Sequence, residues 1–222
     1  TATALVTARM IKLAVESGLL PEGALQLIVG STADLRDRLG PQDVVAFTGS
    51  AATALTLRTR PAIVEAGLRF NVEADSLNAA VLAPDAQPGS PTFERFIQDV
   101  AREITQKAGQ KCTAVRRILA PREVEGQVVE ALVARLAAVV TGDPSDPQVT
   151  MGPLAHGGQL RDALDGIAEL LATSELLHGS GGRAVGVGAP AGKGYFVAPT
   201  LLRSQHPLEK TPVHWREVFA PV

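Results

Sequence analysis

Apolar and polar positions change their spacing repeatedly along the first half of the chain. Apolar residues first recur at helical spacing, and Gly18 followed by Pro21 predicts where that helix ends. Short apolar runs then alternate with further helical segments, which is the pattern of strands and helices that follow one another closely. The predicted helices are residues 4–17, 31–39 and 51–57, and the predicted strands are residues 25–29, 43–47, 68–72 and 79–82.

The second half repeats the alternation with longer helices. The apolar side chains after Pro91 that fall on one helical face are Phe93, Phe96, Ile97, Val100 and Ile104. Residues 179–194 are rich in glycine, but no Lys-Ser/Thr pair follows and no preceding strand feeds a helix, so they predict a surface hairpin rather than a phosphate loop. The predicted helices are residues 91–107, 123–140 and 159–172, and strands are expected at 115–119, from 195 and from 218.

This order of elements predicts the fold class. Strands that alternate with helices through short connections pack as a parallel, doubly wound sheet, so we expect an α/β protein. The 222 residues can bury a sizeable core as one large domain or as parts of two. The chain opens in a helix and stops at residues 218–222, where a strand is expected to begin. Neither end has the character of a natural terminus, and we expect an internal piece of a longer polypeptide.

Composition excludes several classes of partner. The formal net charge of −2 provides no electrostatic basis for binding nucleic acid or an anionic membrane. No apolar run approaches the roughly 18 to 20 residues that span a bilayer. The four histidines are scattered singly, so no metal site is predicted. A single cysteine is typical of a reducing compartment, which predicts a cytoplasmic protein.

That cysteine, Cys112, allows two interpretations. Free cysteine is among the most buried residue types, so a small hydrophobic filler is the simpler one. The setting favours a nucleophile, because Cys112 follows Gly109-Gln110 at a junction between a predicted helix and a predicted strand. Reactive groups concentrate in loops that a rigid scaffold holds in place.

Glu73 is a candidate general base. It follows the apolar run 68–72, so we expect its carboxyl group to be partly desolvated, and burial would raise its pKa toward the range of a useful base. The alternative is an ordinary strand-end acid exposed to water. Glu73 and Cys112 are far apart in the sequence and could meet only through the fold, which their spacing does not establish.

Five ordered motifs extend over essentially the whole chain. They are Val45-Ala46-Phe47-Thr48-Gly49-Ser50, Glu73 after a strand, Gly109-Gln110-Lys111-Cys112, Met151-Gly152-Pro153-Leu154 and Glu217-Val218-Phe219-Ala220-Pro221. Their order and rough spacing resemble the aldehyde dehydrogenase superfamily. Residues 73–78 and 107–117 are most similar to the branch that oxidises CoA-linked semialdehydes from aerobic benzoate or phenylacetate breakdown. The resemblance implies that residues 1–72 are the later part of a Rossmann-like NAD(P)-binding domain, and residues 73–222 most of an α/β catalytic domain.

The resemblance also implies oxidation of an aldehyde to the carboxylic acid with a nicotinamide coenzyme. The thiolate of Cys112 would attack the aldehyde carbon, and hydride transfer from the hemithioacetal would leave a thioester. Glu73 would take the thiol proton, directly or through water, and would later activate the water that hydrolyses the thioester. The backbone N–H of Cys112 would stabilise the oxyanion together with an asparagine that the family places before Thr1.

Cofactor contacts follow from the same resemblance. Gly49 and Ser50 match the turn that meets the pyrophosphate, where exposed N–H groups and the helix dipole favour an anion, although by itself this turn predicts only a helix N-cap. Glu217 matches the glutamate that holds the nicotinamide ribose, with Phe219 beside the ring. If the family's Lys-Pro-Ala directly precedes Thr1, that threonine replaces a glutamate that would repel a 2′-phosphate, so we expect NADP in preference to NAD.

Three substitutions depart from the family pattern and bear on how the coenzyme lies. Glu73-Ala74-Asp75-Ser76 replaces Glu-Leu-Gly-Gly, Ala54 replaces the glycine that closes Gly-Ser-x-x-x-Gly, and Ala220 replaces the glycine of Glu-x-Phe-Gly-Pro. The first two resemble the CoA-semialdehyde branch. Nothing in the sequence explains Ala220.

Three alternative functions stay open. A CoA-acylating dehydrogenase would pass the acyl group to CoA, but such members usually lack the base that Glu73 matches. A cysteine hydrolase would need a histidine partner, and no histidine lies in a motif that supplies one. The piece could also be an inactive scaffold or assembly module. The partners that the resemblance implies are a small aldehyde, CoA-linked in the branch above, and further copies of the chain in a dimer or tetramer.

Overall fold

The computed structural model describes residues 2–30 and 35–222, which form two compact units that divide after Asp75. This division lies slightly beyond the boundary expected at residue 72. Helices and strands are mixed in both units, as an α/β fold requires. The described strands form three two-stranded sheets, of which two are parallel and one is antiparallel. Among the described residues, no helix is long and apolar enough to cross a membrane.

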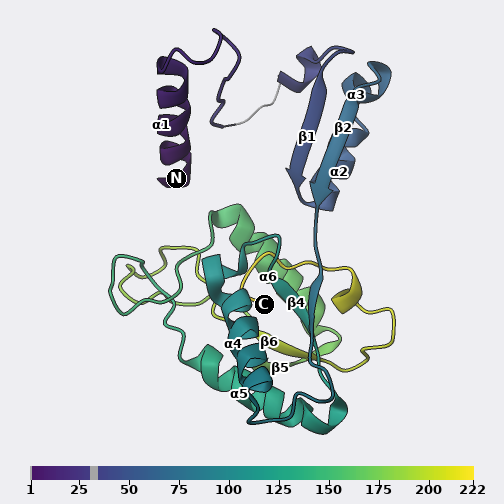
Figure 1. Cartoon of the computed structure of the whole chain (residues 1–222), viewed down its shortest axis with the longest axis vertical. Coiled ribbons are helices and arrows are strands. Elements are labelled where there is room, and N and C mark those ends of the chain that lie inside the picture. Colours follow the sequence, from purple (N-terminus) through teal and green to yellow (C-terminus); the bar gives the residue numbers. More distant parts are fainter. Residues whose placement is uncertain (1, 31–34) are drawn as a thin grey trace. The chain divides into compact units, whose positions relative to one another are not determined.

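The first unit contains a parallel pair of strands with two helices beside it (Figure 1). β1 (Val44–Gly49) pairs with β2 (Arg69–Ala74), and α2 (Ala51–Arg58) and α3 (Pro61–Glu65) connect them. Parallel strands need such a crossover connection, because the end of the first strand and the start of the second lie at opposite ends of the sheet. The buried apolar side chains of this connection are Ala54, Leu57, Ile63 and Leu68.

The start of the first unit departs from the sequence prediction at two places. α1 (Ala2–Glu16) ends before Gly18 as expected, since the φ of +70° at Gly18 is left-handed. The strand expected at 25–29 is wrong, because a strand needs a neighbour and β1 pairs only with β2 in the part of the chain described. Of the helix expected at 31–39, residues 31–34 lie outside the described residues, and Leu35–Arg38 form a 3-10 helix.

Two parallel strands and two long helices make up one half of the second unit. β3 (Asn78–Val81) pairs with β4 (Val115–Leu119), and α4 (Pro91–Thr105) packs against α5 (Glu125–Ala137). Ser90 caps α4 by accepting the Phe93 N–H at 3.2 Å. The predicted apolar face of α4 is confirmed, although Phe96 is only half-buried. Facing residues of α5 complete this core, and they are Val128, Leu132 and Leu136.

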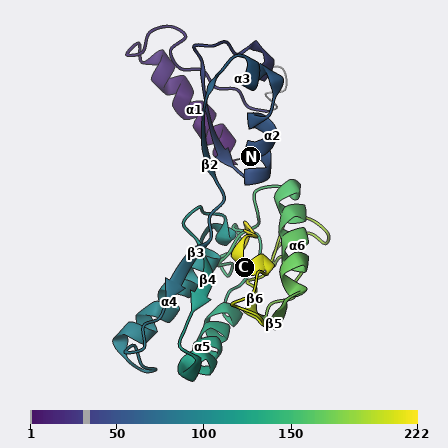
Figure 2. The same ribbon diagram turned by 90° about the vertical axis from the view of Figure 1, so that its right-hand side faces the viewer.

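The other half of the second unit contains α6 (Gly157–Leu171), which lies beside an antiparallel pair of strands (Figure 2). β5 (Ser174–His178) pairs with β6 (Leu201–Ser204). The sequence predicted no strand at β5, because its apolar residues do not alternate. A second core forms around α6, and its buried members are Ala108, Met151, Leu154, Leu160, Ala163, Ile167, Leu170, Val197, Val218 and Ala220.

Three predictions for the last part of the chain are wrong. The glycine-rich segment forms no regular hairpin and makes only isolated bridges, at Arg183–Val197 and Gly142–Val187. The strand expected from 195 is limited to the Val197 bridge, and β6 begins only after Pro199, which has no N–H to donate to a ladder. Residues 218–222 form no strand, and the Pro221 carbonyl instead accepts a hydrogen bond from the Thr200 N–H at 2.8 Å.

Candidate functional site

The loop that carries Cys112 begins with a reversal of the chain at the end of α4. The sequence predicted that this helix continues to Lys107, but it ends at Thr105. Lys107, Ala108 and Gly109 then have φ values of +55°, +52° and +70°. For residues other than glycine this left-handed conformation costs about 1 kcal/mol each. The surrounding contacts therefore have to hold the reversal in place.

Gly109 packs directly on the backbone of the segment from Glu217 to Pro221. A Cβ atom at Gly109 would lie 2.2 Å from the Ala220 carbonyl oxygen and 2.7 Å from the Pro221 nitrogen. Ala108 and Ala220, on either side of this contact, are both buried. The motif around Cys112 and the motif around Glu217 therefore meet backbone to backbone.

We predict that Gly109→Ala destabilises the second unit by about 2–4 kcal/mol, because it adds a clash of about 1–3 kcal/mol to a left-handed alanine. Gly89→Ala is the matched control, since Gly89 also has a positive φ (+81°) but would place its Cβ in open space. The control should lose only about 1 kcal/mol. Urea unfolding of both variants measures the difference, and equal losses would show that the Gly109 contact is not tight.

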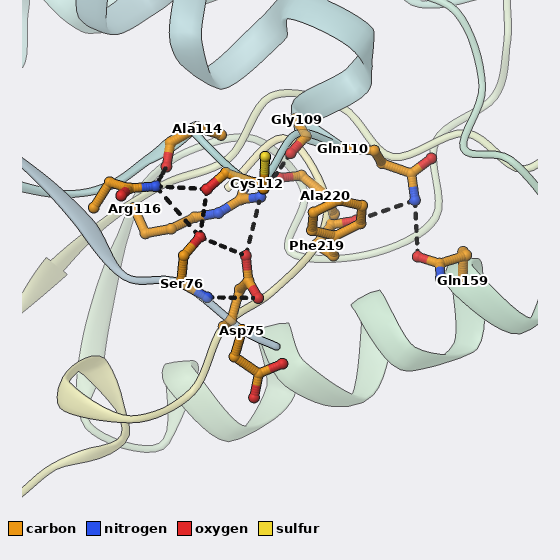
Figure 3. Close-up of polar contacts among 12 residues, drawn as sticks. Asp75, Ser76, Gly109, Gln110, Cys112, Ala114, Arg116, Gln159, Phe219 and Ala220 are labelled. Atoms are coloured by element: carbon orange, nitrogen blue, oxygen red, sulfur yellow. Dashed lines mark hydrogen bonds and ion pairs between the residues drawn. The ribbon is translucent and has the colours of Figure 1, made fainter. Parts of the chain in front are cut away.

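Cys112 lies exposed at the centre of a turn, which contradicts its interpretation as a buried filler. The Ala114 N–H closes this turn by donating to the Lys111 carbonyl at 3.1 Å. The Cys112 carbonyl accepts a hydrogen bond from the Ser76 hydroxyl (Figure 3). It accepts a second one from the Asn78 side-chain amide at 2.8 Å. The Asn78 amide also donates to the Ala114 carbonyl at 3.1 Å. These bonds hold the backbone of the turn.

Gln110 connects the loop to two other parts of the second unit. Its side-chain amide nitrogen donates to Gln159 at 2.8 Å and to the Phe219 carbonyl at 3.3 Å, and its oxygen accepts the Ala155 N–H at 2.9 Å. Gln159 lies in the first turn of α6, whose N-cap is His156. The loop is thereby held against the start of this helix.

Glu217 lies in a buried polar cluster beside the loop. Its carboxylate accepts the Ser76 N–H at 3.1 Å and the Ser76 hydroxyl at 3.5 Å, and it lies 3.9 Å from a guanidinium nitrogen of Arg116. The guanidinium group also lies 5.7 Å from the centre of the Phe219 ring. Burial lowers the pKa of Arg116, and the Glu217 charge partly offsets that effect. Cys112, Glu217 and Phe219 thus belong to one hydrogen-bonded region.

In the first unit, the predicted phosphate-binding turn lies at the start of α2. The Ser50 hydroxyl caps the helix by accepting the Thr53 N–H at 3.2 Å. The Ala51 N–H donates to the Asp75 carboxylate at 3.1 Å, and Asp75 itself has a positive φ of +50°. The helix N-terminus attracts an anion, but the Asp75 carboxylate already occupies the Ala51 N–H, so a coenzyme phosphate would bind here only by displacing it. Gly49 lies at the end of β1.

Glu73 is exposed near the end of β2, so the partial desolvation expected from the sequence is wrong. The reason is that this end of the strand has no cover among the described residues, and the neighbouring Val72 is itself 42% exposed. Glu73, Gly49 and Ser50 belong to the first unit, whereas Cys112 belongs to the second. The pairing of Glu73 with Cys112 stays a prediction.

Several residues of the polar cluster carried no signal of their own in the sequence. Ser76 stood out only as a departure from a glycine pattern, and Arg116 only as part of a longer motif. Asn78 stood out only as the last residue of the segment 73–78, and Gln159 did not stand out at all. Their hydrogen-bond partners lie far along the chain, where the sequence does not reveal them. Within residues 2–30 and 35–222, no group of three or more His, Cys, Asp or Glu side chains is arranged to hold a metal ion.

Comparison with known proteins gives a consistent result. Residues 1–222 match the model of the aldehyde dehydrogenase family. The chain is 44% identical over 222 residues to a 3,4-dehydroadipyl-CoA semialdehyde dehydrogenase of Aromatoleum evansii, covering 100% of the chain and 43% of that relative. It is 28% identical over 228 residues to a 1-pyrroline-5-carboxylate dehydrogenase of Bacillus subtilis, covering 100% of the chain and 41% of the relative.

Solved structures agree with this match. The gamma-glutamyl-gamma-aminobutyraldehyde dehydrogenase of Burkholderia cenocepacia superposes with a TM-score of 0.78 at 28% identity, over 96% of this chain and 41% of that one. A betaine aldehyde dehydrogenase variant of Staphylococcus aureus, solved with NAD+, shares the fold with a TM-score of 0.83 at 24% identity, over 99% of this chain and 42% of that one. The family resemblance and the α/β fold class expected from the sequence are confirmed.

Proposed function

Because the chain belongs to the aldehyde dehydrogenase family, we propose that it contributes the nucleophile and part of the coenzyme site for NAD(P)-dependent oxidation of an aldehyde to its carboxylic acid. The observation that carries this proposal is the exposed thiol of Cys112. It lies on a turn whose backbone is held by hydrogen bonds from Ser76 and Asn78. The chain spans less than half the length of the relatives it matches (43% of the first). The activity is therefore that of the whole protein.

In the proposed reaction, Cys112 loses its proton to Glu73, directly or through water, and the thiolate sulfur bonds to the aldehyde carbon. The backbone N–H of Cys112 stabilises the resulting oxyanion. A nicotinamide coenzyme bound here would supply the hydride acceptor that turns the hemithioacetal on Cys112 into a thioester. Glu73 releases the thiol proton to solvent and then takes a proton from water, whose oxygen attacks the thioester carbon. The acid is released as the carbon–sulfur bond breaks, and Glu73 returns its proton to the Cys112 thiolate.

Four residues would hold the coenzyme. Gly49 and Ser50 would meet its pyrophosphate at the start of α2, and Glu217 would bind the nicotinamide ribose beside Phe219. At the first place, the phosphate would replace the Asp75 carboxylate as the acceptor of the Ala51 N–H. At the second, the Ser76 and Arg116 contacts fix the orientation of the Glu217 carboxylate.

For the substrate we propose a CoA-linked semialdehyde from the ring-cleavage breakdown of benzoate or phenylacetate. The 44% identity to a 3,4-dehydroadipyl-CoA semialdehyde dehydrogenase over the whole chain supports this class. We also propose a cytoplasmic protein that assembles as a dimer or tetramer.

The test is to incubate the full-length protein with a CoA-linked semialdehyde and NADP, with and without added free CoA. Equal amounts of reduced coenzyme and free carboxylate, formed without added CoA, are expected. Coenzyme reduction that occurs only with added CoA, giving a second thioester, would instead support a CoA-acylating enzyme. If the coenzyme is not reduced under either condition, the result would support the alternative of an inactive scaffold or assembly module.

We predict that NADP is preferred over NAD, with kcat/KM at least about tenfold higher, which corresponds to about 1.4 kcal/mol. The physical reason is the absence of a repelling carboxylate at Thr1, a residue that lies outside the described residues. Steady-state kinetics with each coenzyme at a saturating aldehyde concentration measures the ratio. A clear preference for NAD would contradict the prediction.

A further inference from the structure

Arg116 joins the loop of Cys112 to the segment that contains Glu217. It extends from β4, and its side chain is only 4% exposed. One terminal nitrogen donates to the Gly109 carbonyl at 2.6 Å, and the other donates to the Ala220 carbonyl at 2.7 Å. The two carbonyls belong to the two segments that pack backbone to backbone. A single planar group therefore spans their contact.

The same guanidinium group also contacts side chains of the second segment. It lies 3.9 Å from the Glu217 carboxylate and 5.7 Å from the centre of the Phe219 ring. Arginine can make these contacts together because its terminal nitrogens form a rigid fork over a delocalised plane. A lysine at this position has one flexible ammonium group, which could not reach both carbonyls in the same geometry.

The burial of Arg116 has a cost that these contacts offset. Its Nε is buried without a hydrogen-bond partner among the described residues. Burying a charged group is unfavourable unless it is paired and hydrogen-bonded. The paired part of Arg116 is the end that joins the two segments, so its favourable interactions are concentrated there.

We propose that Arg116 is a positioning residue that sets the distance between the Cys112 loop and the Glu217–Phe219 segment, and thereby the distance over which hydride is transferred. The inference rests on the proposed function, in which the substrate carbon is bonded to Cys112 and Glu217 holds the nicotinamide ribose. A misplacement of about 1 Å between reacting groups can lower a rate about 100-fold.

The test compares Arg116→Lys with Arg117→Lys in the full-length protein. Arg117 is the adjacent residue of β4, and it donates to the Leu77 carbonyl at 2.6 Å. Both substitutions keep the charge and remove a guanidinium group from the same strand. Arg116→Lys should lower the single-turnover rate of coenzyme reduction about 100-fold, with a deuterium isotope effect on the aldehyde hydrogen larger than in the unmodified protein. Arg117→Lys should lower that rate less than about fivefold.

A second measurement does not depend on turnover. The rate at which iodoacetamide alkylates Cys112 in coenzyme-free protein reports the conformation of its loop. Arg116→Lys should change this rate at least about fivefold, and Arg117→Lys less than twofold. Equal effects of the two variants on both rates would overturn the inference, because Arg116 would then support only the strand. If the unmodified full-length protein never reduces coenzyme, the proposed function is refuted. In that case a larger change of the alkylation rate in Arg116→Lys than in Arg117→Lys would still support the role of Arg116 in positioning the loop.

Discussion

Replacing Cys112 with alanine is expected to lower turnover by at least about 10⁴-fold, because no other group in the proposed mechanism can form the thioester. The backbone contacts of the turn do not involve the sulfur atom, since Ser76 and Asn78 bind the Cys112 carbonyl. Circular dichroism and the unfolding midpoint should therefore stay unchanged. Steady-state coenzyme reduction by the full-length protein measures the loss.

Cys112→Ser is the matched comparison for this variant. It keeps a nucleophilic atom of similar size but replaces a thiol by a hydroxyl group, which is much less ionised near neutral pH. We expect its turnover to be nearly as low as that of the alanine variant. Retained turnover in Cys112→Ala would refute the assignment of the nucleophile, whatever the serine variant does.

Glu73→Gln is expected to slow hydrolysis of the thioester about 10²–10⁴-fold, the range that general base catalysis contributes. The first hydride transfer should slow less than about tenfold, because a thiol is partly ionised without a base. Stopped-flow measurement should therefore show a rapid burst of reduced coenzyme, close to one per active site, followed by a slow steady rate.

The control for Glu73 is Glu65→Gln, which neutralises another exposed carboxylate of the same unit, at the end of α3. It should leave both the burst and the steady rate within about twofold of the unmodified protein. A Glu73→Gln variant whose burst slows as much as its steady rate would contradict the assignment of Glu73 to the hydrolytic step.

The longer helices were the most predictable part of the fold, since each carries a local signal, whereas the short helix α3 was not predicted. For example, the apolar face of α4 and its N-terminal Ser90-Pro91 pair can each be recognised from a short stretch of sequence. Strands were less predictable, because pairing depends on a partner elsewhere in the chain. Residues 25–29 have a strand-like composition without a described partner, and β5 has a partner, β6, without a strand-like pattern.

The candidate site likewise contains residues that the sequence identifies and contacts that only the fold reveals. Cys112 stood out because it is the only cysteine, and Glu217 because it lies in a family motif. The left-handed turn at 107–109 was missed, because Lys107 and Ala108 are ordinary helix formers whose conformation is imposed by tertiary contacts. The contacts of Ser76 and Arg116 were missed because spacing along a chain carries no information on which distant backbone groups a side chain reaches.

The contacts around Cys112 also affect when the site can form during synthesis. Ser76 and Glu217 are 141 positions apart, and Arg116 and Ala220 are 104 positions apart. The core between α4 and α5 includes few residues beyond Leu136 and can assemble while the rest of the chain is still being made. Since a ribosome adds about 5–20 residues per second, the Cys112 thiol spends several seconds outside the ribosome before Glu217 and Ala220 follow. Of the described parts of the second unit, the loop with the nucleophile is therefore among the last to reach its final conformation.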